Sequence, residues 1–281
     1  ISFTDCENKA AISLAPTKVG GAYIGGIVGQ AWAEKKDQTI KFIRTKNSGA
    51  ISLTGASWGG NPYVAGIFGQ PNNYSAIEFD GCENSGDITV NATASSKPYI
   101  GGIVGNETNK VSVLVKNCVN KGNISVLSTI GTCRIAGIYG SRNNATSVVT
   151  IEGCTNLGAV KITSNNTANS NAYAVGGVLG YAAAGSTTIK NCTNGSSTDA
   201  TKGEITFAKA EAGIGIAGIN GLSNIPIQIT GCKNYGHVAI TGDGGHKDGK
   251  KSVGISGILG YSLVAGITVT DCNNVNAVFC N

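Results

Sequence analysis

The chain has 281 residues, of which 41% are hydrophobic and only 13% are charged, and its formal net charge is +5. It contains 42 glycines but only 5 prolines. This composition argues against helices and favours many short strands joined by tight turns. The scattered basic residues argue against a nucleic-acid partner, and no apolar run reaches the roughly 18 residues needed to insert into a membrane.

The chain opens with a segment, B, that alternates apolar and polar residues and ends in Cys-x-Asn. B occurs as Ile1–Asn8 and Ile77–Asn84, and further copies end at Asn120, Asn156, Asn194, Asn234 and Asn274. In one copy, which ends at Asn47, Thr45 replaces the cysteine. Period-two alternation predicts a strand with every second side chain pointing inward. The Asn-x-Gly that follows predicts a tight turn, whose glycine we expect in a left-handed conformation.

A second segment, C, follows the turn directly. It occurs as Gly49–Leu53, Gly86–Val90, Gly122–Val126, Gly158–Ile162, Gly203–Phe207 and Gly236–Ile240. C also alternates apolar and polar residues, so it predicts a second strand.

The third segment, A, carries the pattern Gly-Gly-Ile-Val-Gly and its variants. It occurs as Tyr23–Gly29, Tyr63–Gly69, Tyr99–Gly105, Arg134–Gly140, Ala174–Gly180, Gly215–Gly221 and Gly254–Gly260, at spacings of 35 to 41 residues. We interpret its glycines as bends where the chain turns a corner. A phosphate-binding loop is disfavoured, because such a loop occurs once and opens a helix.

Whole units that recur in register predict an all-β, single-domain parallel β-helix, or β-solenoid, rather than an antiparallel sandwich. We expect residues 1–281 to form about seven to eight coils of about 38 residues, with three short strands each and the commoner right-handed turn. Because the chain starts at Ile1 and inside a repeat, we expect it to be cut from, or to continue into, a longer chain or assembly.

The cysteines follow the repeat, which indicates a ladder of buried thiols inside the core rather than a disulfide framework. The ladder positions are Cys6, Cys82, Cys118, Cys154, Cys192, Cys232 and Cys272, whereas Cys133 is outside the pattern. Cys-x-x-Cys spacing is absent, and we expect neither a metal site nor a cofactor.

The turn asparagines should form a second ladder, with each side-chain amide bonded to the next coil. Glu7, Lys46 and Glu83 fall at equivalent positions, which suggests an ion-pair ladder on the surface. Asp243 and Asp248 could hold a cation, but a solvated glycine-rich loop is the favoured interpretation.

Aromatic residues gather in the N-terminal coils and form a candidate ligand-binding strip. The strip comprises Tyr23, Trp32, Trp58, Tyr63, Tyr74 and Tyr99. It could stack on sugar rings or on a partner protein, or it could simply shield the strands. If the source is eukaryotic, possible N-glycosylation sites are Asn73, Asn91, Asn106, Asn123, Asn144 and Asn165.

The Gly-Gly-Ile-Val-Gly strands, each paired with Cys-x-Asn-x-Gly, resemble the GLUG-type and related glycine-rich solenoid repeats of secreted or cell-surface proteins, which are best known in bacteria. This resemblance covers the whole chain and implies an adhesin, stalk or surface fibre. The cysteine ladder departs from what is expected of a typical bacterial adhesin.

These patterns lead to a structural, extracellular or cell-surface solenoid with no catalytic residues as the leading hypothesis. One alternative is a carbohydrate-binding module that uses the Tyr/Trp strip, and another is a polysaccharide lyase or hydrolase built on a β-helix. The expected partners are a second copy stacked end to end or flanking domains, and a glycan or surface protein.

Overall fold

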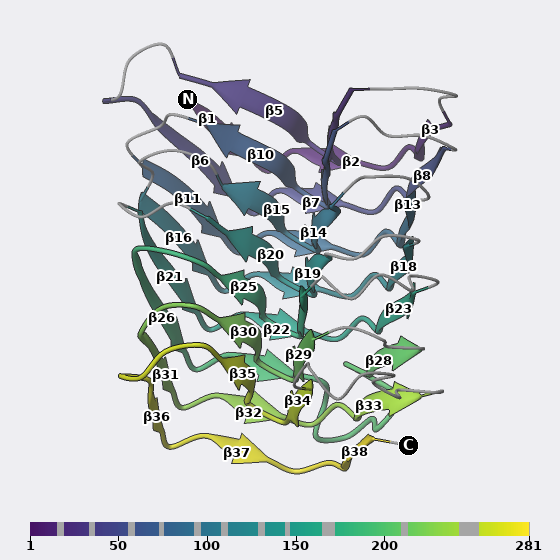
Figure 1. The fold of residues 1–281 in the computed structure, drawn as a ribbon. Helices are drawn as coiled ribbons and strands as arrows, with labels where there is room; N and C mark the ends of the chain where they lie inside the picture. The colour runs from purple at the N-terminus through teal and green to yellow at the C-terminus, as the bar shows by residue number, and fades with distance from the viewer. Residues whose placement is uncertain are drawn as a thin grey trace.

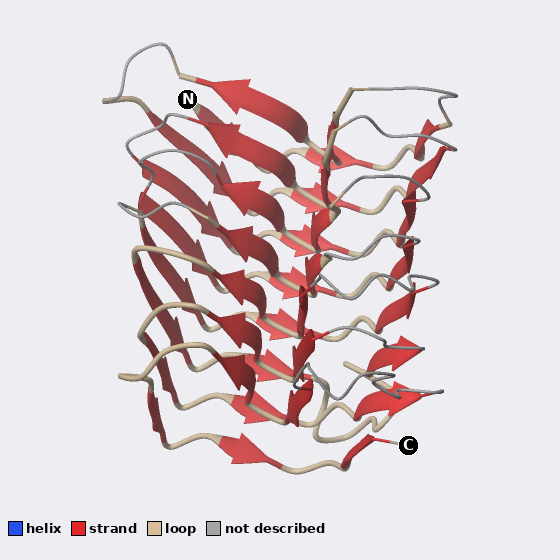
Figure 2. Cartoon of the chain, in the orientation of Figure 1, coloured by secondary structure: helices blue, strands red, loops and turns tan. Residues whose placement is uncertain are grey.

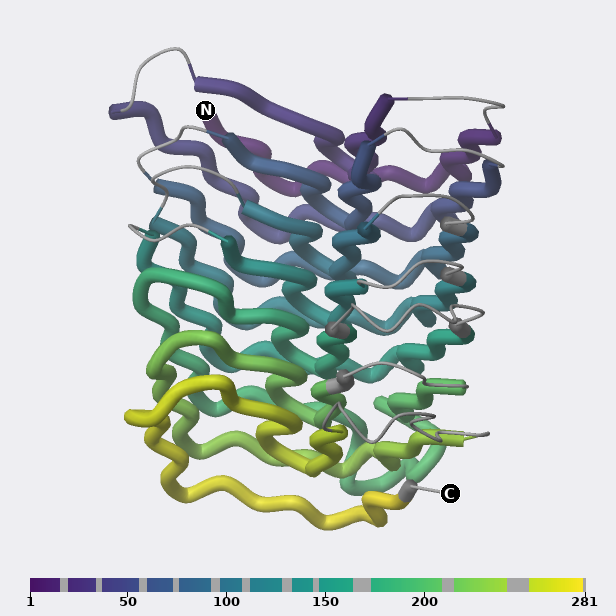
Figure 3. The backbone as a smooth tube through the Cα atoms, viewed as in Figure 1, coloured from purple at the N-terminus to yellow at the C-terminus, as the bar shows by residue number. Residues whose placement is uncertain are grey.

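The computed structural model describes residues 1–15, 20–33, 37–55, 60–72, 76–92, 97–107, 112–128, 133–143, 147–164, 172–208, 213–241 and 253–280. All the elements in these ranges are strands (Figure 2). They build five sheets that run the length of the molecule, and every strand pair is parallel (Figure 1). The tube in Figure 3 shows the coils stacked from the N-terminus at one end to the C-terminus at the other. The chain is therefore a parallel β-solenoid, as predicted.

Segments B and C form three eight-stranded sheets. The B sheet contains β1 (Ser2–Thr4), β6 (Thr39–Ile43), β11 (Ala76–Asp80), β16 (Ser112–Lys116), β21 (Val148–Glu152), β26 (Ser186–Lys190), β31 (Ile227–Thr230) and β36 (Thr268–Thr270). The Asn sheet contains β2 (Glu7–Asn8), β7 (Lys46–Asn47), β12 (Glu83–Asn84), β17 (Val119–Asn120), β22 (Thr155–Asn156), β27 (Thr193–Asn194), β32 (Lys233–Asn234) and β37 (Asn273–Asn274). The C sheet contains β3 (Ile12–Leu14), β8 (Ile51–Gly55), β13 (Ile88–Ala92), β18 (Ile124–Ser128), β23 (Val160–Ser164), β28 (Ile205–Ala208), β33 (Val238–Thr241) and β38 (Val278–Cys280).

Segment A is divided between two seven-stranded sheets. The A1 sheet contains β4 (Ala22–Gly25), β9 (Pro62–Ala65), β14 (Tyr99–Gly101), β19 (Arg134–Ala136), β24 (Ala172–Gly176), β29 (Gly213–Ala217) and β34 (Val253–Ser256). The A2 sheet contains β5 (Val28–Trp32), β10 (Phe68–Asn72), β15 (Val104–Glu107), β20 (Tyr139–Arg142), β25 (Leu179–Ala182), β30 (Asn220–Ser223) and β35 (Leu259–Ser262). The prediction of three strands per coil was therefore wrong, because Cys-x-Asn forms a strand of its own and segment A bends into two.

The hydrophobic core consists of two clusters. The first packs the B sheet against the A2 sheet and includes Phe42, Phe79 and Val104. The second packs the C sheet against the A1 sheet and includes Ile88 and Ile100. In Figure 1 these two pairs of sheets form the two halves of the stack, with the Asn sheet between them. Each half encloses its own core, which we call the B–A2 core and the C–A1 core.

The Asn ladder is confirmed, and it lies at the junction of the two cores. Hydrogen bonds of 2.8 Å join the side chains of Asn8, Asn47, Asn84, Asn120, Asn156, Asn194, Asn234 and Asn274 in succession. Each donor amide also bonds a backbone carbonyl in its own turn, as Asn120 does to Gly122 at 2.9 Å. The ladder therefore satisfies its buried amides and ties every coil to the next.

The glycine bend of segment A packs directly on this ladder. A Cβ added to Gly66 would lie 2.3 Å from Cγ of Asn84, and one added to Gly102 would lie 2.4 Å from Cγ of Asn120. These glycines permit a close approach of the backbone that no other residue allows.

Of the glycines that open segment C, only Gly203 has a positive φ, of 69°. The left-handed backbone conformation instead recurs one residue before each cysteine position. The residues concerned are Asp5, Arg44, Gly81, Asn117, Gly153, Asn191, Gly231 and Asp271, with φ between 47° and 65°. The turn glycine is needed for a different reason. A Cβ on Gly86 would lie 2.1 Å from the carbonyl oxygen of Gly49 in the preceding coil. Stacking, and not backbone handedness, explains the turn glycines other than Gly203.

Replacing Gly102 by alanine should prevent close stacking of the A bend on Asn120 and strongly destabilise the fold. Gly20→Ala is the matched control, because a Cβ there meets no atom within 4 Å. Urea unfolding followed by circular dichroism should show a much lower midpoint for Gly102→Ala and an almost unchanged one for Gly20→Ala. Equal midpoints would contradict the proposed packing.

Removing a ladder amide from the interior should also be costly. Asn120→Ala leaves the buried Nδ2 of Asn84 without one of its two acceptors and Oδ1 of Asn156 without the side-chain amide that donates to it. Orphaned buried polar groups cost about 1–3 kcal/mol each, so we expect a loss of roughly 2–5 kcal/mol in the free energy of unfolding. Asn274→Ala, at an exposed position, should cost less than half as much.

Candidate functional site

The aromatic strip predicted from the sequence is partly assembled. Tyr23, Tyr63 and Tyr99 are in register on β4, β9 and β14, with ring centroids 5.2 Å and 5.0 Å apart and nearly parallel planes. Tyr23 is 42% exposed but Tyr99 only 6%, while Trp32 at the end of β5 is 63% exposed. Trp58 and Tyr74 lie outside the described residues.

Tyr23, Tyr63 and Tyr99 form a stacked column, which we call the tyrosine column, and a cation–π contact with Arg134 extends it. The guanidinium of Arg134 on β19 lies 5.1 Å from the ring centroid of Tyr99 and 4.1 Å from that of Tyr181 on β25. Arg134 also donates to the side chains of Ser141 and Asn143 on the A2 side. The column therefore fills the outer corner between the A1 and A2 sheets.

Stacking limits what this column can bind. Tyr63 has Tyr23 on one face and Tyr99 on the other, and burial raises the pKa of its hydroxyl. Among the described members of the strip, only Tyr23 and Trp32 expose a large ring area. A sugar ring could stack there, but not against the faces of Tyr63.

The cysteine ladder lies in the B–A2 core, as expected. Cys82, Cys118, Cys154, Cys192 and Cys232 are fully buried, Cys6 and Cys272 are half-buried, and none of these seven forms a disulfide. The thiol of Cys82 donates to the backbone carbonyl of Phe42 in the preceding coil at 3.2 Å. In the same way, the hydroxyl of Thr45 donates to the backbone carbonyl of Phe3 at 3.1 Å. Thr45 thus occupies the position of the cysteine and makes the same hydrogen bond to the preceding coil. Cys133 is buried in the C–A1 core.

The outer face of the B sheet carries an ion-pair network over the N-terminal coils. Glu78 pairs with Lys41 at 2.9 Å and with Lys116 at 3.1 Å, and Lys116 also reaches Asp80 at 3.2 Å. These contacts cross three successive strands and hold the coils together from outside. Such exposed pairs contribute little individually.

Glu7, Lys46 and Glu83 are in register as predicted, but the two glutamates form their ion pairs with other lysines. Glu7 pairs with Lys9 at 3.4 Å, and Glu83 pairs with Lys121 at 2.9 Å.

A buried ion pair inside the B–A2 core was missed at the sequence level. Glu107 and Arg142 are register partners on β15 and β20, both fully buried, with Oε1 and Nε 3.9 Å apart. The guanidinium also donates to the carbonyl of Ser147. Burial raises the pKa of nearby Tyr139 and lowers that of Arg142. Both charged residues lie two positions after the last glycine of segment A in successive copies, and this spacing could have revealed the pair.

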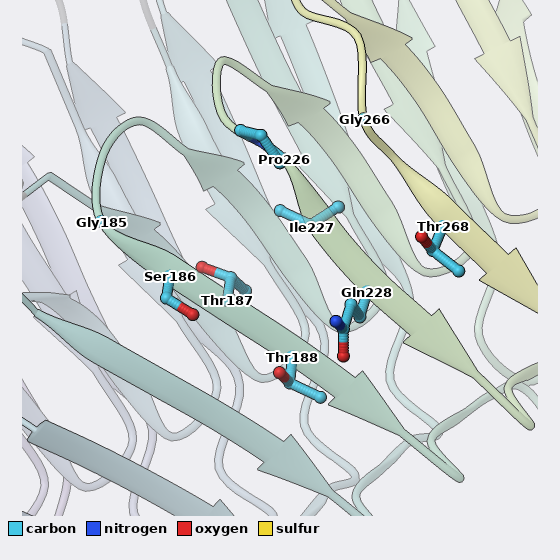
Figure 4. A pocket seen from close by; sticks show the side chains of 9 residues that line it. All are labelled: Gly185, Ser186, Thr187, Thr188, Pro226, Ile227, Gln228, Gly266 and Thr268. Carbon is cyan, nitrogen blue, oxygen red and sulfur yellow. The ribbon is translucent and has the colours of Figure 1, made fainter.

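A shallow hollow lies on the outer B sheet near the C-terminal coils (Figure 4). It measures roughly 310 Å³ and is lined by Gly185, Ser186, Thr187, Thr188, Pro226, Ile227, Gln228, Gly266 and Thr268. Thr188, Gln228 and Thr268 project from three adjacent strands, so the surface they present is polar and uncharged.

A second concave region lies on the outer face of the C sheet. One hollow of roughly 490 Å³ is lined by Asp87, Thr89, Asn123, Ser125, Ala159, Lys161, Thr201 and Glu204. An adjoining hollow of roughly 330 Å³ shares Thr89, Ser125 and Lys161 and adds Asn91, Val126, Leu127 and Thr163. Because of these shared residues, the two form one continuous trough across β13, β18 and β23.

The possible glycosylation sites differ in accessibility. Asn123 is exposed and Asn91 half-exposed, whereas Asn106 is only 1% exposed. Asn73, Asn144 and Asn165 lie outside the described residues, as do Asp243 and Asp248. Within the described ranges, no group of three or more His, Cys, Asp or Glu is placed to hold a metal ion. The same ranges contain no helix long and apolar enough to cross a membrane.

Comparison with protein-family models, with curated proteins and with solved structures finds no match for this chain.

The buried thiols of Cys118 and Cys192 should be unreactive in the folded protein. Burial raises the pKa of Cys118 and Cys192 well above the ordinary value and blocks reagent access. Iodoacetamide labelling at pH 8, read by peptide mass spectrometry, should modify the half-buried Cys6 and Cys272 first and reach Cys118 and Cys192 only in denaturant. Rapid native labelling of Cys118 would show that the ladder is not buried.

Stability should depend on the charge of Glu78. Hydrogen bonds from Lys41 and Lys116 lower the pKa of its carboxyl group, so its stabilising effect is present above the unfolded value of about 4.3 and is lost as pH falls through the lower folded value. Glu78→Gln should lower Tm by a few degrees at pH 7 and flatten the decline of Tm between pH 5 and 3. Thr188→Val, at an uncharged position of the same row, is the control. A wild-type pH profile in Glu78→Gln would contradict this account.

Proposed function

We propose that this chain is a structural segment of an extracellular or cell-surface protein, such as a stalk, fibre or adhesin. It acts through its shape and outer surface and not through catalysis. We also propose that the solenoid has seven to eight coils and that they turn in the right-handed sense.

The observation that carries the proposal is the Asn ladder, which joins the coils from Asn8 to Asn274 by hydrogen bonds of 2.8 Å. The ion pairs of Glu78 and the buried pair of Glu107 with Arg142 join neighbouring coils in the same way. An enzyme would gather its polar and charged side chains at one site. Here the ladder amides and the ion pairs are distributed from coil to coil along the axis. Such a distribution suits a rod that resists bending and shearing.

The proposed partners follow from this role. The rod would join flanking domains or a second copy end to end, and its side would contact a glycan or a surface protein. No role in nucleic-acid binding or membrane insertion is proposed.

A carbohydrate-binding module on the N-terminal coils is the second candidate. It is favoured by the exposure of Tyr23 and Trp32, which are 42% and 63% accessible. Loss of glycan binding in Trp32→Ala, with binding retained in Tyr99→Phe, would support this alternative.

The natural full-length protein provides the test of the structural role. Immunogold electron microscopy should place it on the outer surface of its cells, and negative staining of the isolated protein should show rods or filaments. Cells that lack the protein control for the antibody. Labelling confined to the cell interior, together with compact particles, would contradict the proposal.

A further inference from the structure

The trough on the outer C sheet presents two parallel rows of polar side chains. Thr89, Ser125 and Lys161 are register partners in one row, and Asn91, Leu127 and Thr163 form the next. All six side chains are at least partly exposed. The rows extend across three coils.

The trough is bordered by the one turn in the described Asn sheet that departs from the repeat. The side-chain amide of Asn84 bonds a carbonyl two residues on, at Gly86, whereas that of Asn194 bonds Gly203, nine residues on. The extra residues, 195–202, form what we call the ledge. Insertions in solenoid repeats collect on one face, which is often the binding face.

The ledge is a folded structure. Gly195 and Gly203 have φ of 84° and 69°, which lets the chain leave the coil and return to it. Within the ledge, the carboxylate of Asp199 accepts hydrogen bonds from the hydroxyl and the backbone amide of Thr201 at 2.6 Å and 3.0 Å. These bonds position Thr201, which lines the trough.

The charges of the trough already have partners. Lys161 pairs with Glu204 at 2.9 Å, and the carboxylate of Asp87 accepts a hydrogen bond from the backbone amide of Asn123 at 2.8 Å. The groups that remain for a ligand are hydroxyls and amides, which can both donate and accept, except that the hydroxyl of Thr201 already donates to Asp199 and is left as an acceptor. They match an uncharged, hydroxyl-rich molecule, and the aliphatic side chain of Leu127 offers a surface for its C–H groups.

A peptide or a polyanion fits the trough less well. β13, β18 and β23 each have a strand paired on both sides, so no sheet edge is available for strand addition. Asp87, Lys161 and Glu204 together carry one more negative than positive charge, which disfavours an anionic polymer.

We propose that this trough binds a neutral polysaccharide chain, with the hydroxyls of Thr89, Ser125 and Thr201 bonding its sugar hydroxyls. The inference rests on the proposed function, because it assigns the surface through which an adhesive solenoid would act.

An array of neutral glucans, mannans, galactans and xylans, with pectate and heparin as polyanions, tests the inference. The intact chain should bind at least one neutral polysaccharide and neither polyanion. The double variant Thr89→Val and Ser125→Ala should bind that polysaccharide at least about tenfold more weakly, because two hydrogen-bonding groups are lost. Replacing residues 195–202 by one serine, which restores the ordinary turn, should weaken binding similarly.

The control is the double variant Ser186→Ala and Thr188→Val in the hollow of the outer B sheet, which should bind like the unaltered chain. Circular dichroism checks that every variant is folded. Binding that survives both trough variants, or is lost in the control or in Trp32→Ala, would overturn the trough assignment and leave a surface role intact. An absence of binding to every neutral glycan would overturn it too, whereas the structural proposal is decided separately by microscopy.

Discussion

The contact between the Asn ladder and the glycine bend of segment A governs the rest of the structure. Asn84 and Asn120 occupy the junction of the two cores, and Gly66 and Gly102 approach their side chains more closely than any Cβ would permit. Because the ladder amides are buried, each must bond within the protein, and the next coil supplies the partner. The ladder therefore fixes the register between coils and holds segment A inward at the same time.

The contact of the ladder with the glycine bend divides each coil into two halves, whose cores contain different kinds of side chain. The B–A2 core holds the cysteine ladder and the Glu107–Arg142 pair, whereas the C–A1 core is lined mainly by aliphatic side chains. It also leaves three distinct outer surfaces: the charged B face around Glu78, the tyrosine corner around Tyr63, and the hydroxyl-rich C face. Among the surfaces formed by the described residues, the C face combines continuous concavity with an ordered insertion, which is why it is the strongest candidate for recognition.

Position-specific repetition explains how much could be predicted from the sequence. The solenoid, the Asn ladder and the equivalence of Thr45 with cysteine follow from residues that recur at one place in each unit. The glycines of segment A indicated a bend, but the formation of a separate strand on each side of that bend was not predicted, since it depends on the approach of Gly66 to Asn84 across the coil. The burial of Tyr99 was missed for the same reason, because the corner exists only once segment A has bent. The ledge has a sequence signal in the long spacing from Asn194 to Gly203, but its position beside the trough needs the fold.

Hydrogen exchange of the asparagine side-chain amides, followed by NMR of ¹⁵N-labelled protein, tests the central role of the ladder most directly. The amides of Asn84, Asn120 and Asn156 should exchange orders of magnitude more slowly than that of Asn123, which lies exposed on the outer C face. Exchange of all four side chains at similar, rapid rates would show that the ladder is not closed and would contradict the account.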